Sequence, residues 1–165
     1  LAVEDNAQQW QKAFGQARAD SRFLIASITK PMTAVGVMTL VDRGQLRLDE
    51  DIVRYLPERP GILLRHLLTH TSGLPDMLPE NTALRQRNAP LEEYVRLALR
   101  TPLLFAPGTK WSYSSTGILL AAEIARRLDG RPFAELLRQE VFQPWGMRQT
   151  VLGKPAGPWV RSQTD

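Results

Sequence analysis

Cysteine is absent from this 165-residue chain, and histidine occurs only twice. Without a thiol the chain can form no disulfide, no thiolate metal site and no catalytic cysteine, and cysteine usage leaves its redox compartment open. Long apolar runs are also missing. The longest, such as residues 117–122 (GILLAA), are far shorter than a membrane-spanning helix. The sequence therefore predicts no membrane span.

Clustered positive charge is another absence. The chain carries 21 Lys and Arg against 17 Asp and Glu, a net charge of +4, but the basic residues are scattered along it. A nucleic-acid surface or a polybasic membrane surface needs them gathered, so we expect neither partner. An apolar content of 43% is enough for one buried core.

The beginning of the chain has neither an initiator methionine nor the basic-then-apolar order of a signal peptide. We therefore expect the N-terminus to be truncated. The location of the protein stays open between periplasm or secretion and cytoplasm.

Two short strands are predicted near the start, at 9–15 and 22–26. A helix is an alternative for the first, because Trp10 and Phe14 are four residues apart. A helical pattern follows over 27–43, with Pro31 in its first turn, Val35, Met38 and Val41 at helical spacing, and Gly44 as its stop.

Further helices are expected where apolar residues recur at helical spacing between Gly and Pro breakers. They cover residues 62–70, 91–100, 116–128 and 133–142. Residues 48–57 predict an acidic cap and a short helix that ends at a proline. The polar segment 76–90 lies between prolines and predicts a surface loop that borders a cleft.

Ser27 and Lys30 form a Ser-x-x-Lys spacing at the start of the first long helix. Residues three apart share a helix face, so the two side chains can exchange a proton. A serine hydroxyl becomes a good nucleophile when a base takes its proton, and lysine serves as that base when burial or positive charge lowers its pKa. The helix N-terminus would favour the resulting oxyanion. The alternative is a capping serine beside a surface lysine.

His66 and His70 are four residues apart on one predicted helix face, which is the spacing of a two-histidine metal site. No glutamate stands between them, and no third ligand is evident nearby. We therefore favour a structural role for His70 at the turn that follows, and we expect no metal and no other cofactor.

Several segments in order resemble the serine β-lactamase-like superfamily, which includes class C β-lactamases, D-Ala-D-Ala carboxypeptidases, D-aminopeptidases and family VIII carboxylesterases. The segments are 23–34 (FLIASITKPMTA), 46–51 (LRLDED), 65–75 (RHLLTHTSGLP), 105–109 (FAPGT), 113–117 (YSSTG) and 145–147 (WGM). The resemblance implies that Ser27 is the nucleophile, Lys30 the lysine of its motif, and Tyr113 the tyrosine of a Tyr-x-Asn motif. Tyr113 would be co-base or leaving-group acid.

The chain departs from the superfamily pattern at two points. Ser115 replaces the asparagine of Tyr-x-Asn and so lacks an amide for a substrate carbonyl. Family VIII esterases resemble this version, which favours esters. The Lys-Thr-Gly or His-x-Gly strand has no counterpart, so we expect a partial chain. The resemblance gives Ser115 a substrate-binding role. The alternatives are that Tyr113 is a packing aromatic under the turn at Pro107 and that Ser115 is an N-cap, a role compatible with substrate binding.

The resemblance implies an α+β, β-lactamase/transpeptidase-like fold, of which this chain holds mostly the helical half and lacks the C-terminal strands. We expect one partial domain over 1–165, with strands in 1–26, a helical region over 27–150 and a loop over 151–165. The implied function is a serine hydrolase that forms an acyl-enzyme on Ser27 from an ester, β-lactam or D-amino-acid peptide. A catalytically impaired binding or structural module is the alternative, and the oligomeric state stays open.

Overall fold

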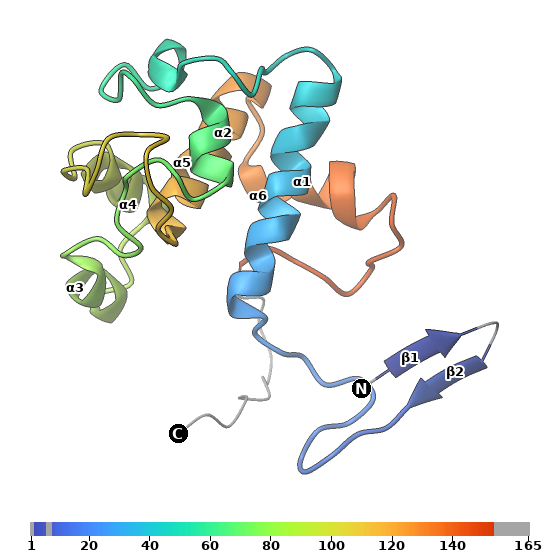
Figure 1. The fold of residues 1–165 in the computed structure, drawn as a ribbon. Coiled ribbons are helices and arrows are strands. Elements are labelled where there is room, and N and C mark those ends of the chain that lie inside the picture. Colours follow the sequence, from blue (N-terminus) through green and yellow to red (C-terminus); the bar gives the residue numbers. More distant parts are fainter. Residues whose placement is uncertain (1, 6–7, 154–165) are drawn as a thin grey trace. The chain divides into compact units, whose positions relative to one another are not determined.

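The computed structural model describes residues 2–5 and 8–153 (Figure 1). They form two compact units, one ending at Ile28 and the other spanning Thr29–Gly153. The first unit contains an antiparallel pair of strands, β1 (Ala2–Asp5) and β2 (Gln8–Gln11), with Ala2 opposite Gln11. A strand is thus present at the start of the predicted 9–15 segment but ends at Gln11, and the helical alternative for that segment is wrong.

The strand predicted over 22–26 is wrong. Phe23 alone makes a β-bridge there, and the 3-10 helix η1 (Ala26–Ile28) begins at the end of the segment. A strand needs a partner for its ladder of hydrogen bonds, and an apolar composition does not supply one. Within residues 2–5 and 8–153, β1 and β2 are the only strands. From residue 154 onward, the predicted 151–165 loop lies outside the described residues.

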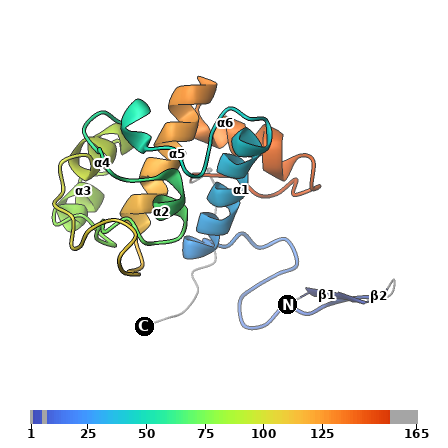
Figure 2. The same ribbon diagram turned by 45° about the horizontal axis from the view of Figure 1, so that its top comes forward.

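The second unit is helical, and α5 lies at its centre in contact with four other helices (Figures 1 and 2). The five are α1 (Thr29–Asp42), α2 (Leu64–Leu68), α4 (Leu91–Ala98), α5 (Ser115–Asp129) and α6 (Phe133–Leu137). Each lies within or close to a predicted helix, and the 48–57 segment forms the short 3-10 helix η2 (Ile52–Arg54) behind an Asp51 cap. In the described part of the chain, no helix is both long enough and apolar enough to cross a membrane.

Helix α1 begins and ends close to where the sequence predicts, and none of the three residues at helical spacing, Val35, Met38 and Val41, is fully buried. Its buried residues are Thr33, Gly36, Val37 and Leu40, whereas Val35 is exposed. The helix is apolar around much of its circumference, so spacing alone does not select the inward side. Gly36 permits close packing, because a Cβ there would lie 2.4 Å from Cδ2 of Leu137 on α6.

Three further expectations need correction. The predicted surface loop 76–90 contains a helix, α3 (Asn81–Gln86), which buries Leu84. The predicted helix 133–142 is α6 followed by a π-helical turn, η3 (Arg138–Phe142). Helix α2 ends at Leu68, so His70 does not lie on the helix face of His66. His70 instead adopts a left-handed conformation with φ of 60°.

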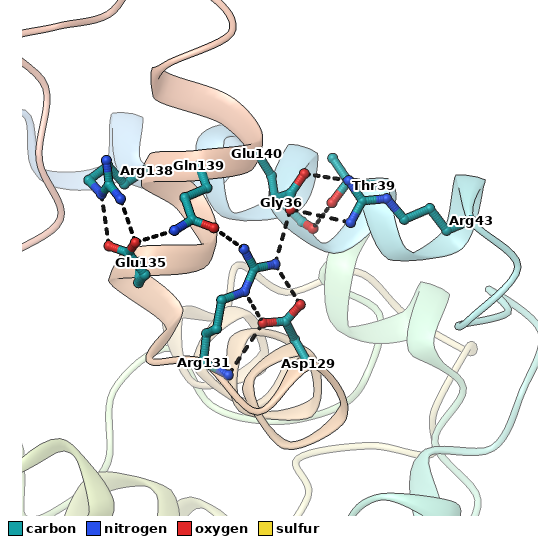
Figure 3. Close-up of polar contacts among 9 residues, drawn as sticks. All are labelled: Gly36, Thr39, Arg43, Asp129, Arg131, Glu135, Arg138, Gln139 and Glu140. Atoms are coloured by element: carbon teal, nitrogen blue, oxygen red, sulfur yellow. Dashed lines mark hydrogen bonds and ion pairs between the residues drawn. The ribbon is translucent and has the colours of Figure 1, made fainter.

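A network of charged side chains ties the end of α1 to η3 (Figure 3). Glu140 accepts hydrogen bonds from Arg43 and, at 3.0 Å, from Arg131, and Arg131 also donates to Asp129 at 2.5 Å and 2.6 Å. The bonds from Arg43, followed by those from Arg131, hold the pKa of Glu140 below its ordinary value of 4.5. The folded state therefore favours the carboxylate.

Replacing Glu140 with glutamine should lower the melting temperature by about 2–4 °C at neutral pH and low salt. The lowered pKa means that this stabilisation is complete above about pH 4.5 and is lost as the pH falls through the folded value. Thermal melts at pH 7 and pH 3 should therefore show the difference between wild type and variant shrinking in acid and in 1 M salt. Glu58→Gln, at an exposed position, is the control. Equal effects of the two substitutions would contradict a role for the network.

Candidate active site

Lys30 and Tyr113 come together in the second unit. Lys30 is in the first turn of α1, and Tyr113 lies two residues before α5. The Lys30 Nζ is 4.7 Å from the centroid of the Tyr113 ring. That separation is within the range of a cation–π contact, and it places an amine beside a phenol. Two residues that could each carry a proton are therefore neighbours although they are far apart in sequence.

Ser27 lies in η1, which directly precedes α1 along the chain. The predicted helix over 27–43 is thus a 3-10 turn followed by an α-helix. The Ser-x-x-Lys motif crosses the boundary between the two units, because Ser27 belongs to the first and Lys30 to the second.

The segment around Tyr113 is held by the turn at residues 70–76. The Ser112 N–H donates to the His70 carbonyl at 2.9 Å, and the Ser114 N–H donates to His70 Nδ1 at 3.1 Å. The Ser114 hydroxyl donates to the Pro75 carbonyl at 3.0 Å. Both neighbours of Tyr113 are therefore anchored to one turn.

Asp76 of this turn and the N-cap Ser114 satisfy the first backbone donors of α5. The Ser115 N–H donates to Asp76 Oδ1 at 3.0 Å, the Thr116 N–H to the Asp76 carbonyl at 3.2 Å, and the Gly117 N–H to Ser114 Oγ at 2.8 Å. A helix leaves these N–H groups without partners inside the helix, and its N-terminus favours a nearby negative charge. Asp76 supplies that charge, so Tyr113 precedes a helix end that is well fixed.

Ser115 is the first residue of α5 and not its N-cap, so the capping interpretation of Ser115 is wrong. Ser114 fills that position, because its extended backbone and its hydroxyl oxygen suit the cap. The Ser115 hydroxyl donates to Asp76 Oδ1 at 2.6 Å. Its proton is thus directed at Asp76, and its oxygen retains lone pairs that can accept a hydrogen bond.

His70 packs against two aromatic rings as well as the backbone. Its ring centroid is 4.8 Å from that of Tyr113 at an interplanar angle of 34°, and it meets Trp111 edge-on at 6.2 Å. Burial, followed by the charge of Lys30, lowers the pKa of His70. A neutral imidazole suits Nδ1 as the acceptor for Ser114, which is a structural role at the turn.

The other histidine is engaged separately. His66 Nδ1 accepts the Leu63 N–H at 3.2 Å at the start of α2, and burial lowers its pKa. Among the residues that the structure describes, no group of three or more His, Asp or Glu side chains could hold a metal ion.

Asp76 and Ser114 are site residues that the sequence alone does not indicate. The sequence pattern puts Asp76 at the beginning of a surface loop and makes Ser114 the middle residue of the tyrosine motif. Their partners lie about 40 residues away along the chain, at a separation of 39 for Ser115 and Asp76. Helical and strand periodicities relate near neighbours only, so no local pattern reveals these contacts.

The fold and these residues agree with the family to which the chain is similar in sequence. The beta-lactamase family model matches residues 1–164, and the chain belongs to this family. Its members are serine hydrolases. The predicted superfamily resemblance is thus confirmed, and the solved structures that resemble the chain have β-lactamase-like folds.

Particular relatives extend the comparison. Esterase EstB of Burkholderia gladioli is 38% identical over 151 residues, covering 79% of this chain and 38% of EstB. Penicillin-binding protein 4* of Bacillus subtilis is 34% identical, covering 91% of this chain and 36% of the relative. A D-stereospecific amidohydrolase from Streptomyces superposes with a TM-score of 0.79 at 27% identity, over 89% of this chain and 49% of that one. The chain therefore spans less than two-fifths of the two curated relatives.

Proposed function

We propose that this chain carries the nucleophile and proton-transfer residues of a serine hydrolase that acts through an acyl-enzyme on Ser27. The observation that carries the proposal is the contact between Lys30 and Tyr113, at 4.7 Å from amine to ring centroid. It joins the Ser-x-x-Lys motif to the tyrosine motif. The anchoring of Ser112 and Ser114 on either side of Tyr113 supports it, because proton transfer needs a fixed geometry.

In the proposed reaction, Ser27 Oγ attacks the substrate carbonyl carbon while its proton passes to Lys30 or Tyr113. The tetrahedral intermediate collapses, the bond to the leaving group breaks, and the leaving group takes that proton. Water then attacks the acyl-enzyme, returns a proton to Ser27 and releases the acid. Residues 1–165 would form one part of a single domain for this reaction.

We propose esters and D-amino-acid amides as the substrates, with β-lactams as less favoured ones. The departure from Tyr-x-Asn motivates this choice. Since the Ser115 hydroxyl donates to Asp76, its oxygen can accept a hydrogen bond from a substrate but has no second proton to give a carbonyl. The names of EstB and the Streptomyces amidohydrolase agree with this substrate range.

Treating the full-length protein with a fluorophosphonate should add one phosphonyl group to Ser27, seen by peptide mass spectrometry. The Oγ–P bond forms as fluoride leaves, and activated serines react in this way. Ser27→Ala should abolish the adduct and lower kcat/KM for a p-nitrophenyl ester by about 10³-fold or more. Ser21→Ala, at another serine of the first unit, should still form the adduct on Ser27 and should keep the wild-type kcat/KM. Labelling elsewhere, or full turnover by Ser27→Ala, would refute the proposal.

A second candidate is a family member that binds such ligands without turning them over. The engagement of Ser115 by Asp76 favours it, because one substrate donor of the family motif is lost. Full-length protein that has not been treated with the fluorophosphonate separates the two candidates. A stable stoichiometric adduct with a p-nitrophenyl ester and no further product release would support the binding protein, and steady release would exclude it.

A further inference from the structure

His70 contacts the chain on both sides of Tyr113. Its carbonyl accepts the Ser112 N–H at 2.9 Å, and its ring Nδ1 accepts the Ser114 N–H at 3.1 Å. A single residue thus fixes both peptide neighbours of the tyrosine. The remaining freedom of Tyr113 is mainly rotation of its own side chain.

The imidazole ring also restrains that side chain. It lies 4.8 Å from the Tyr113 ring, centroid to centroid, at an angle of 34°. The Lys30 amine is 4.7 Å from the same tyrosine centroid. Because His70 lies beyond the end of α2 with φ of 60°, its ring and its carbonyl both reach the 112–114 segment. This conformation is uncommon outside glycine, although histidine is among the residues that adopt it more often.

The contact requires a neutral ring. Nδ1 is a hydrogen-bond acceptor here, and protonation would turn it into a donor facing the Ser114 N–H. The charged or titratable groups that face His70 are Lys30 of α1, Asp76 of the turn and Tyr113. The positive charge of Lys30 opposes protonation of the His70 ring, as does burial of the ring, whereas Asp76 favours it.

We propose that His70 is a positioning residue, whose neutral imidazole holds Tyr113 in the orientation needed for proton transfer. The inference rests on the proposed function, in which Tyr113 carries a proton. Protonation of His70 would release the Ser114 N–H and shift Tyr113 relative to Lys30. A displacement of about 1 Å in such a group costs up to about 100-fold in rate.

The kinetic test compares His70→Phe and His70→Asn in the full-length protein. Phenylalanine retains a ring against Tyr113 but has no acceptor, and asparagine restores an acceptor and suits the left-handed backbone. We expect His70→Phe to lower kcat for a p-nitrophenyl ester by about 10- to 100-fold with little change in KM, and to lose the fall in kcat that protonation of His70 causes as the pH drops below about 6.5. His70→Asn should recover part of kcat. His66→Gln, a control at the other histidine, should leave the pH profile unchanged.

A second measurement does not need activity. In ¹⁵N-labelled wild type, the Ser114 amide resonance should shift together with the His70 imidazole as the pH is varied. An amide insensitive to that titration, or wild-type kcat and pH profile in His70→Phe, would overturn the positioning role. If wild type hydrolyses none of the substrates and forms no Ser27 adduct, the proposed function fails, while the Ser114 titration still decides whether His70 holds this segment.

Discussion

Tyr113→Phe should lower kcat/KM for ester hydrolysis by about 10²- to 10⁴-fold, the usual contribution of a positioned general acid or base. The substitution removes the hydroxyl and retains the ring. The ring makes the contacts with His70 at 4.8 Å and with Lys30 at 4.7 Å, so both should persist. We therefore expect the melting temperature to change by less than about 4 °C. Steady-state kinetics and a thermal melt of the same sample measure the two effects.

The matched control is Tyr94→Phe, which makes the same chemical change at a half-buried position on α4. It should leave kcat/KM within about twofold of wild type, because no step of the proposed reaction involves it. The adduct at Ser27 provides a further distinction, since Tyr113→Phe should slow its formation without moving it to another residue. Unchanged kcat/KM in Tyr113→Phe would exclude the hydroxyl from the reaction and leave Tyr113 a packing aromatic.

Gly73→Ala should destabilise the protein by roughly 3–5 kcal/mol, a large part of the 5–15 kcal/mol typical of a folded domain. Gly73 has φ of 80°, and a Cβ there would lie 2.2 Å from the Phe105 carbonyl oxygen. That obstacle is backbone and has little room to move, because the Leu104 N–H donates to the Gly73 carbonyl at 2.7 Å. Urea unfolding of wild type and variant gives the difference in free energy.

Gly44→Ala separates the two causes. Gly44 has φ of 70°, yet a Cβ at this position would have no heavy atom within 4 Å beyond its immediate chain neighbours. Alanine at this position has the backbone strain without the steric clash, so we expect the free energy of unfolding to fall by about 1–2 kcal/mol. Equal costs at the two glycines would show that the close approach of residues 73 and 105 does not contribute. Since residues 70–76 also hold the chain around Tyr113, Gly73→Ala should lower activity as well, and Gly44→Ala should not.

Much of the helical unit follows from local signals. Gly44 and Gly130 end α1 and α5 with positive φ, and Pro132 precedes α6. These positions are decided within one or two turns of chain, which is the range over which backbone propensity and capping act. The predictions that were wrong concern segments whose structure depends on more than local signals. The 22–26 segment is apolar like a strand, but a strand also needs a partner for its hydrogen bonds. Helix α3 has few apolar residues in its pattern, although Leu84 is buried in the core cluster.

The candidate site divides in the same way. The residue types and order of Ser27, Lys30 and Tyr113 are properties of the sequence by itself, and with the other motifs they indicated the family. Only the tertiary structure decided that Lys30 lies beside Tyr113. It also decided that His70 and Asp76 anchor the tyrosine segment and that the Ser115 hydroxyl is directed at Asp76. The contacts of Asp76 with Ser115 and of His70 with Ser114 join residues 39 and 44 positions apart, and Lys30 and Tyr113 are farther apart still. Packing around α5 brings them together, because burial of apolar surface depends on the whole fold and leaves no periodic mark in any one segment.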